Sequence, residues 1–402
     1  MAATTTKTKI EAKTLSSNSP KMIPRSVGIW LLIGVIMVLV QIFLGGVTRL
    51  TNSGLSITEW DIVTGTLPPL NAEEWDIAFD LYKTEAKVQV DRLNPDITMS
   101  EFKYIYFWEY FHRLWARLMG FVFLFPFLYF WWRGYFTKKL MKQLGKIVGL
   151  AAIVASAGWI MVASGLAKGD IVSHFMIPTE KMGLIPSLII IDTLDSAWVN
   201  GYKLTIHLSL AVLLLGYLFW VTLQVLQPNP TDTHHRRMRR YTWRITWIIG
   251  LQIVLGGFMS GMKAGLFYPN FPHMEVSPDG SWVWIAEVLK DQSAWTWSNI
   301  VDYDDSMFAS ALVQLLHRGT AYLLCILILV FFFTLGRIQV STILKKGGMV
   351  LILVLLTQVF LGIFTLVSCV GAVPVTLGVL HQLVGVLLLL SMLFVNYQFK
   401  KT

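Results

Sequence analysis

Charged residues and cysteines are what this chain of 402 residues has least of. Only 14% of the residues are charged and 55% are hydrophobic, whereas a soluble protein is about 25% charged. The two cysteines, Cys325 and Cys369, lie in separate apolar stretches and form no CxxC motif. These shortages exclude a disulfide framework and a cysteine-based metal site, and they indicate an integral membrane protein.

Long apolar runs are what the sequence has in abundance. A membrane-spanning helix needs about 20 such residues. Eight runs reach or approach this length, at 27–47, 104–131, 146–166, 203–226, 244–264, 309–334, 349–369 and 375–397. The sequence therefore predicts an all-α integral membrane protein with eight transmembrane helices, surrounded by membrane lipid.

Lysine and arginine gather in alternate loops between these runs, at 7–25, 133–146, 236–244, 337–346 and 400–401. Most acidic residues fall in the other loops, at about 48–103, 167–202 and 265–308. Because cytoplasmic loops carry the positive charge, both termini are predicted to be cytoplasmic. The net charge of +9 and the HHRRMRR run at 234–240 are then topology signals, and no nucleic-acid partner is expected.

The N-terminal residues favour a disordered cytoplasmic tail over a targeting peptide. Residues 1–26 are rich in Thr, Ser and Lys, and the first arginine is Arg25. Mitochondrial transit peptides are Arg-rich. We therefore expect a multi-pass protein of the cell inner (cytoplasmic) membrane rather than of the mitochondrial inner membrane.

The two halves of the chain repeat each other. QIFLGG at 41–46 recurs as QIVLGG at 252–257, and FHRLWARLMG at 111–120 resembles LHRGTAYLL at 316–324. YKLTIHLSLAVLLL at 202–215 similarly resembles VTLGVLHQLVGVLLLL at 375–390. The repeat predicts two tandem pseudo-symmetric four-helix bundles, 27–226 and 244–397. A basic cytoplasmic linker, 227–243, joins them, and a short cytoplasmic tail, 398–402, follows.

Four histidines obey the repeat: His112, His207, His317 and His381 lie one in each even-numbered run. A single intramembrane histidine would most simply make an interhelical hydrogen bond. Four at matching depth, where polar groups are costly, favour paired metal ligands, His112 with His207 and His317 with His381. Two neutral imidazoles suit a haem iron, whereas a zinc site would need further ligands nearby.

Glycines in the odd-numbered runs reach the same predicted depth as the histidines. Bare backbone beside a flat macrocycle fits a haem, although small residues also mediate plain helix packing. These glycines are Gly45, Gly46, Gly165, Gly256, Gly257 and Gly362.

One acidic residue distinguishes the two halves. Glu109 and His112 are three residues apart and share a helix face, whereas the equivalent of Glu109 in the second half is Gln314. This asymmetry suggests one catalytic site and one electron-carrying or structural site, because a carboxylate beside a haem can transfer protons. The alternative is an intrahelical ion pair between Glu109 and Arg113. The sequence leaves two kinds of partner open, haem propionates and acidic side chains, for the arginines Arg113, Arg117 and Arg318.

Five motifs resemble those of the haem A synthase family, in particular its proteobacterial and mitochondrial branch. They are FLGGVTRLTNSGLSITEW (43–60), EYFHRLWARLMG (109–120), GWIMVASGL (158–166), QLLHRGTAYLL (314–324) and LGIFTLV with VPVTLGVLHQ (361–382). The resemblance implies oxidation of the C8 methyl group of haem O to the formyl group of haem A, by two hydroxylations via haem I. It also implies a haem b held by His317 and His381, the substrate haem at His112 and His207, and Glu109 as the essential carboxylate.

Partners follow from the same resemblance. Association with haem O synthase is expected, because free haem O is apolar and reactive. The identity of the electron donor and the oligomeric state, a homo-oligomer included, are left open by the sequence.

Three features depart from the family pattern: the insert at 175–201, Lys263 in GMKAG, and the segment YPNFPHMEVSPDG after it. Two other functions also use a tandem helical repeat. A di-haem b electron-transfer subunit that oxidises quinol would need the same four histidines but no Glu109. A transporter would place its glycine interruptions near the midplane, whereas most glycines here lie toward the predicted outer end.

Overall fold

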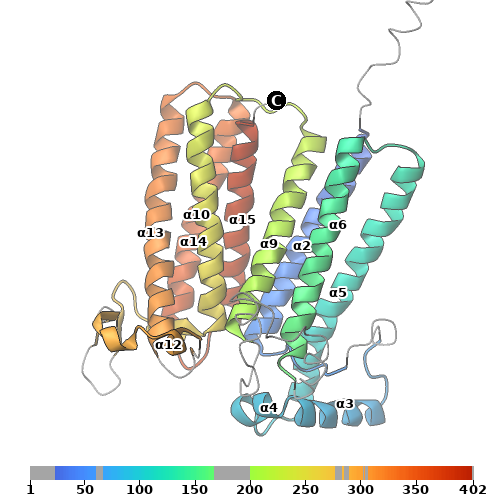
Figure 1. Ribbon diagram of the computed structural model, residues 1–402, viewed down its shortest axis with the longest axis vertical. Coiled ribbons are helices and arrows are strands. Elements are labelled where there is room, and N and C mark those ends of the chain that lie inside the picture. Colours follow the sequence, from blue (N-terminus) through green and yellow to red (C-terminus); the bar gives the residue numbers. More distant parts are fainter. Residues whose placement is uncertain are drawn as a thin grey trace, which may run out of the picture.

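Eight long helices dominate the computed structural model, which describes residues 23–59, 67–166, 200–276, 283–284, 289–301, 303 and 307–400. Each is long and apolar enough to cross a membrane. They are α2 (Arg25–Leu50), α5 (Met99–Trp132), α6 (Lys138–Ala163), α9 (Gly201–Leu226), α10 (Arg236–Gly261), α13 (Met307–Arg337), α14 (Thr342–Val367) and α15 (Val375–Gln398). The predicted all-α membrane fold is confirmed. Figure 1 shows that α15 ends at the same end of the bundle where α2 begins.

Several helices begin earlier than the apolar runs predict. α6 begins at Lys138, α10 at Arg236 and α14 at Thr342, about two turns before the predicted starts. Residues 236–243 of the predicted linker 227–243 are therefore helical and belong to α10. Hydropathy marks only the part of a helix that lies in hydrocarbon. Lysine and arginine are good helix formers, so the backbone continues as a helix into the more polar region.

Helices of the two halves pack in equivalent pairs. In the first half α2 packs on α5 and on α9, and α6 packs on α9. In the second half α10 packs on α13 and on α15, and α14 packs on α15. The halves meet where α2 and α9 lie against α10 and α15, as Figure 1 shows. This equivalence supports the tandem repeat predicted from the sequence.

The ends of α2 and α10 are also built alike. Asn52 and Lys263 both follow the helix end in the left-handed conformation, with φ of 53° and 49°, a common way for a helix to terminate. Lys263 therefore has a local structural role at the end of α10. Arg49 donates to the carbonyl of Gly261 at 3.0 Å and thereby ties the two helix ends together.

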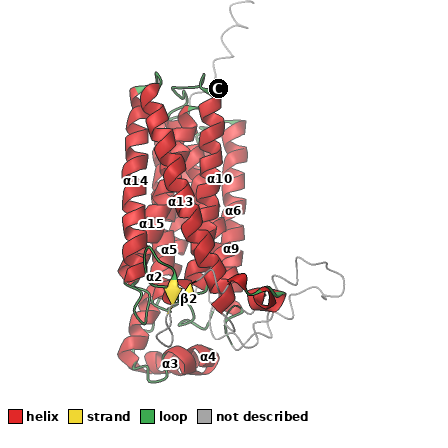
Figure 2. Ribbon diagram, turned by 90° about the vertical axis from the view of Figure 1, so that its left-hand side faces the viewer, coloured by secondary structure: helices red, strands yellow, loops and turns green. Residues whose placement is uncertain are grey.

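A helical cap covers the end of the first half away from the C-terminus. The predicted loop 48–103 contains α3 (Ala72–Glu85) and α4 (Lys87–Leu93). Phe79 and Tyr82 of α3 pack with Leu55 and with Phe102 of α5 in a separate small core. Figure 2 shows α3 and α4 lying across the end of the long helices. The cap thus holds the segment after α2 against α5, which matters for the site below.

Short elements also lie at this end of the second half. Two two-residue strands, β1 (Glu275–Val276) and β2 (Val283–Trp284), pair antiparallel, as Figure 2 shows in part. The short helices η3 (Ala264–Leu266), η4 (Gln292–Ala294) and α12 (Trp297–Val301) complete this region. Most of the insert predicted at 175–201 lies outside the described residues. Its last residues begin α9, where the Asn200 side chain accepts from the Tyr202 amide at 2.9 Å.

Asp232 anchors the segment between α9 and α10 to the start of α14. Its side chain accepts from the Ser341 amide at 2.9 Å and from the Ser341 and Thr231 hydroxyls at 2.6 Å. Burial by itself would raise the pKa of Asp232, but these hydrogen bonds hold it below its usual range. The ionised carboxylate therefore stabilises the fold.

We expect Asp232→Ala to lower the melting temperature of the purified protein. The variant leaves hydrogen-bond donors without an acceptor, which should lower the free energy of unfolding by about 1–3 kcal/mol. Because the folded pKa is lowered, the stabilisation is complete above the unfolded value of about 4 and is lost as the pH falls through the folded pKa. The difference from wild type should therefore shrink in acid. Asp96→Ala, at an exposed position, is the control, and equal melting of both variants at neutral pH would contradict the prediction.

Candidate functional site

Each of the four histidines lies against a glycine on the preceding long helix. A methyl group built on that glycine would come within 2.8–3.4 Å of the imidazole ring. The pairs are Gly45 with His112, Gly158 with His207, Gly256 with His317, and Gly362 with His381. All four histidines are half-buried and lie within about the first four turns of their helices. The repeat therefore produces four copies of one helix–helix contact.

The glycine pairs of α2 and α10 each serve two contacts. Gly45 and Gly256 face the histidine of their own half, whereas a methyl group on Gly46 would lie 3.0 Å from Gln382. A methyl group on Gly257 would likewise lie 3.1 Å from Thr205, again in the other half. The GG motif thus lets α2 and α10 approach both a histidine and the opposite bundle.

Gly165, which the sequence predicted at the depth of the histidines, has no histidine among the nearest described side chains. A methyl group on Gly165 would meet Leu55 at 3.0 Å, in the small core under the cap. Gly158, two turns earlier on α6, has the position opposite His207. Gly165 lies beyond the end of α6 at Ala163, whereas Gly158 stands five residues before that end, as Gly45 stands before the end of α2 at Leu50.

His317 and His381 are brought together, with ring centroids 6.5 Å apart. An imidazole nitrogen binds a metal at about 2.0 Å, so a metal between two imidazoles separates their ring centres by about 6 Å. Among the described residues no group of three or more His, Cys, Asp or Glu could hold a metal ion. Two facing imidazoles without further ligands fit the axial positions of a haem iron.

Three glutamines accompany the histidines. Gln41 and Gln252 lie one turn before Gly45 and Gly256, and each donates to the backbone carbonyl of the facing histidine, at 3.2 Å and 3.0 Å. Gln358 has the same place before Gly362 and lies 3.4 Å from His381 Nε2.

The amide oxygens of all three glutamines are buried and have no hydrogen-bond partner among the described residues, and the same holds for Nδ1 of His381. A histidine that binds iron through one ring nitrogen needs an acceptor for the N–H group of the other. Gln358 lies beside Nε2 of His381, so half a turn of its amide would let the oxygen accept from Nε2–H and would leave Nδ1 to bind the iron. The residues present therefore fit a haem whose histidine ligands are oriented by amide oxygens.

His207 differs from the other three histidines because a backbone group takes the place of the glutamine. Val154 lies one turn before Gly158, and its carbonyl oxygen is 3.0 Å from His207 Nδ1. A carbonyl can only accept, so Nδ1 carries the proton and Nε2 is left with its lone pair. His207 thus has the tautomer that a metal ligand needs.

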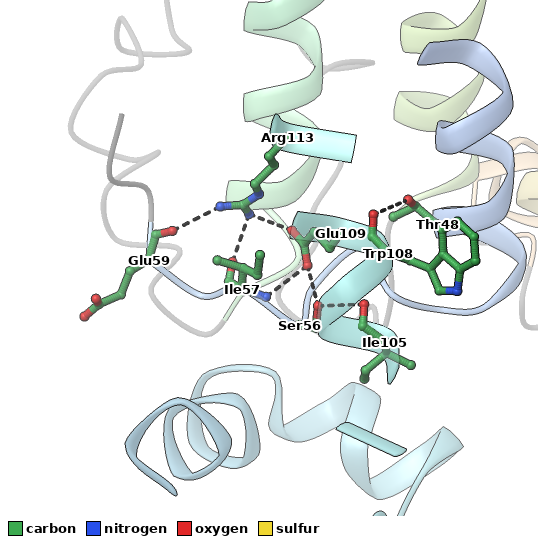
Figure 3. A network of polar contacts seen from close by, with 8 residues as sticks. All are labelled: Thr48, Ser56, Ile57, Glu59, Ile105, Trp108, Glu109 and Arg113. Carbon is green, nitrogen blue, oxygen red and sulfur yellow. Dashed lines mark hydrogen bonds and ion pairs between the residues drawn. The ribbon is translucent and has the colours of Figure 1, made fainter. Parts of the chain in front are cut away.

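Glu109 lies at the centre of a polar network between α5 and the segment after α2 (Figure 3). It is 2% exposed. One carboxylate oxygen accepts from the Ser56 hydroxyl at 2.8 Å and from the Ile57 amide at 2.9 Å. The other accepts from Arg113 at 2.6 Å. The intrahelical ion pair that the sequence left open is therefore formed, and it belongs to a larger network.

Arg113 and Arg318 clamp equivalent segments of the two halves. Arg113 donates to the carbonyls of Ile57 and Glu59 at 2.9 Å and 3.1 Å, as Figure 3 shows. Arg318 donates to the carbonyls of Tyr268 and His273 at 2.8 Å and 3.0 Å. Each arginine thus holds the segment that follows the first helix of its half.

The residue one turn before each arginine differs between the halves. Gln314, at the position of Glu109, donates to the carbonyl of Ala264 at 2.8 Å and is fully buried. The second half therefore keeps the clamp but has a neutral amide where the first half has a carboxylate.

Substituting the site glycines should displace the histidines. We expect Gly362→Ala to lower haem content severalfold, because its methyl group would lie 2.8 Å from His381. Gly250→Ala, on α10, is the control, since a methyl group there meets no atom of the described residues within 4 Å. Haem absorbance per chain measures the effect, and a Gly362→Ala variant with the haem content of wild type would contradict the expectation.

Comparison with known proteins shows the family of the chain. A family model described as cytochrome oxidase assembly protein (COX15-CtaA) matches residues 28–393. The chain belongs to this family. Similar proteins named "Heme A synthase" occur in Flavobacterium psychrophilum, 33% identical over 94% of this chain and 99% of the relative, and in Bradyrhizobium sp. BTAi1, 36% identical over 90% and 88%. A third, from Nitrosomonas eutropha, is 34% identical over 92% of both chains.

Sequence reasoning missed the glutamines and Gly158 in this member of the family. The signal for the glutamines was present, because QxxxG occurs at 41–45, 252–256 and 358–362. A glutamine and a glycine four residues apart lie on one helix face, and both touch the histidine opposite. Gly158 lacks the glutamine, so the motif alone would not have found it.

Proposed function

We propose that the chain is a haem A synthase, an oxidoreductase that converts the C8 methyl group of haem O to the formyl group of haem A. Two successive hydroxylations pass through the hydroxymethyl compound haem I. The observation that carries this proposal is a repeated histidine–glycine contact with a buried carboxylate beside it in one half only. The relatives named "Heme A synthase" add support.

We assign the haem b cofactor to His317 and His381 as axial ligands. Their 6.5 Å separation supports this assignment, and the neutral Gln314 suits a site that does not handle protons. A haem b bound here supplies electron transfer to the substrate site.

We assign the substrate haem O to His112 and His207 in the first half. The Nε2 lone pair of His207 and the adjacent Glu109 support this assignment. Glu109, one turn from His112, is held by Ser56, Ile57 and Arg113, so its carboxylate has a defined position. Its role in the proposal is to take or deliver a proton at the substrate during hydroxylation.

The glutamines are positioning residues in this proposal. Gln358→Leu should lower the affinity for haem b by roughly 10–100-fold and raise its reduction potential, because the histidine loses an acceptor that makes it more basic. Haem titration and redox titration of the absorbance measure both effects. Gln143→Leu is the control, since Gln143 makes a plain interhelical contact with Gln224 at 3.3 Å. An unchanged potential in Gln358→Leu would contradict the role.

We propose that the basic end of the bundle faces the cytoplasm of a bacterial inner membrane, which places both termini inside. The histidines then lie toward the outer face. Association with haem O synthase belongs to the same proposal and is an expectation from the family alone.

Haem extraction tests the proposal. The purified protein should yield haem b together with haem O, haem I or haem A, identified by chromatography and mass. A di-haem b electron-transfer subunit, the alternative from the sequence, would yield haem b alone at about two per chain. That result, obtained even when haem O is supplied, would overturn the synthase proposal.

A further inference from the structure

A basic pocket of about 470 Å³ lies at the end of the bundle that carries the C-terminus. It is formed by the end of α9, the first turns of α10 and the residues after α15, where the two halves of the chain meet (Figure 1). Its lining residues are Trp220, Arg239, Arg240, Trp243, Arg244, Trp247 and Lys400. The pocket is remote from the histidines, which lie toward the opposite end.

Among the described residues, four cations and no acid line the pocket. None of its three arginines or Lys400 forms an ion pair with a carboxylate of the described residues. Burial, together with the charge of nearby Lys139, lowers the pKa of Lys400. The positive charges therefore repel one another, and an anion bound among them would relieve this repulsion.

Tryptophans form the other walls of the pocket. Trp220 packs against Trp243, with ring centroids 5.6 Å apart, and against Tyr397 at 5.3 Å. Trp247 is 75% exposed, and Leu251, one turn further along α10, is 51% exposed. Tryptophan prefers the level of the lipid head groups, and the exposed stripe leads from there toward hydrocarbon. The pocket is thus cationic at its base and continues into an apolar surface.

We propose that this pocket binds the phosphate of an anionic phospholipid, with the acyl chains lying along Trp247 and Leu251. Guanidinium groups suit a phosphate because they donate two parallel hydrogen bonds. Basic pockets between helices on the cytoplasmic side of membrane proteins bind such head groups. A soluble anion would use the cations but not the exposed apolar stripe, which a lipid covers. The bound lipid would join α9, α10 and α15 across the junction of the two halves.

Native mass spectrometry of the full-length protein, stripped of lipid and titrated with phosphatidylglycerol, tests the proposal. We expect one phosphatidylglycerol to bind much more tightly than phosphatidylcholine. The triple variant R239Q/R240Q/R244Q should weaken it by roughly tenfold or more. The control variant K345Q/K346Q removes charge at the start of α14 but none from the pocket, and it should bind like wild type. Equal losses in both variants would mean diffuse attraction and would overturn the proposal.

Two further measurements keep the test decisive if the triple variant inserts poorly. Lys400→Gln lies beyond the last helix, so it should weaken phosphatidylglycerol binding without altering insertion. Brominated phosphatidylglycerol should quench tryptophan fluorescence in wild type and quench it less in Trp247→Leu. Displacement of the lipid by millimolar inorganic phosphate, with no preference for phosphatidylglycerol over phosphate, would show a site for a free anion and refute a lipid site.

Discussion

Replacing Glu109 with glutamine should stop the conversion of haem O while haem b stays bound. The amide oxygen of glutamine can still accept from Ser56 and Ile57, but it cannot take up or deliver a proton. General acid–base groups contribute about 10²–10⁴-fold to rates, and we expect a loss in this range. Extraction and mass identification of the haems, after supply of haem O, measure the conversion.

The second half of the chain offers a matched control for this variant. Gln314→Glu places a carboxylate at the equivalent buried position, where it can form an ion pair with Arg318 in the next helix turn. It should leave conversion largely intact, because that half does not hold the substrate in our proposal. Ser56→Ala removes one hydrogen bond from Glu109 and tests the network without removing the charge.

The outcome also separates catalysis from structure. If Glu109→Gln converts haem O at the rate of wild type while Glu109→Ala does not, the carboxylate serves only to hold the segment after α2. Glu109→Gln and Glu109→Ala can differ in this way because Arg113 binds both Glu109 and the segment 57–59, as Figure 3 shows. Our assignment of Glu109 as the proton-transferring group would then be withdrawn.

Alanine variants of the four histidines should divide into two classes. His317→Ala and His381→Ala should lose haem b and all conversion, because each removes one of two axial ligands. His112→Ala and His207→Ala should keep haem b, with its absorbance spectrum unchanged, and should lose bound haem O and its products. Absorbance per chain and the mass of extracted haems distinguish the classes.

A histidine outside the membrane helices provides the control for these variants. His234→Ala, at an exposed position, should retain both haems and conversion. Loss of haem b in all four site variants alike would contradict the division of labour between the halves. It would indicate instead that the histidines serve the packing of the bundle as a whole.

Much of the fold follows from local properties of the sequence. Apolar runs predicted all eight long helices, because an unpaired backbone in hydrocarbon is too costly for any other local structure. Helix starts were less accurate, as α10 shows by beginning at Arg236 and not at 244. The two helices of the cap, α3 and α4, were not predicted, because their stability comes from packing on Phe102 and Leu55 more than from their own hydropathy.

Sequence alone determined the number and type of the long helices, the four histidines, and the difference between Glu109 and Gln314. These depend on composition, period and internal repetition, which can be read along one chain. Tertiary structure alone decided that Gly158, and not Gly165, faces His207, and that Glu109 binds Ser56 and Ile57. Such contacts join residues about 50 positions apart, so they depend on how the helices rotate and pack against one another.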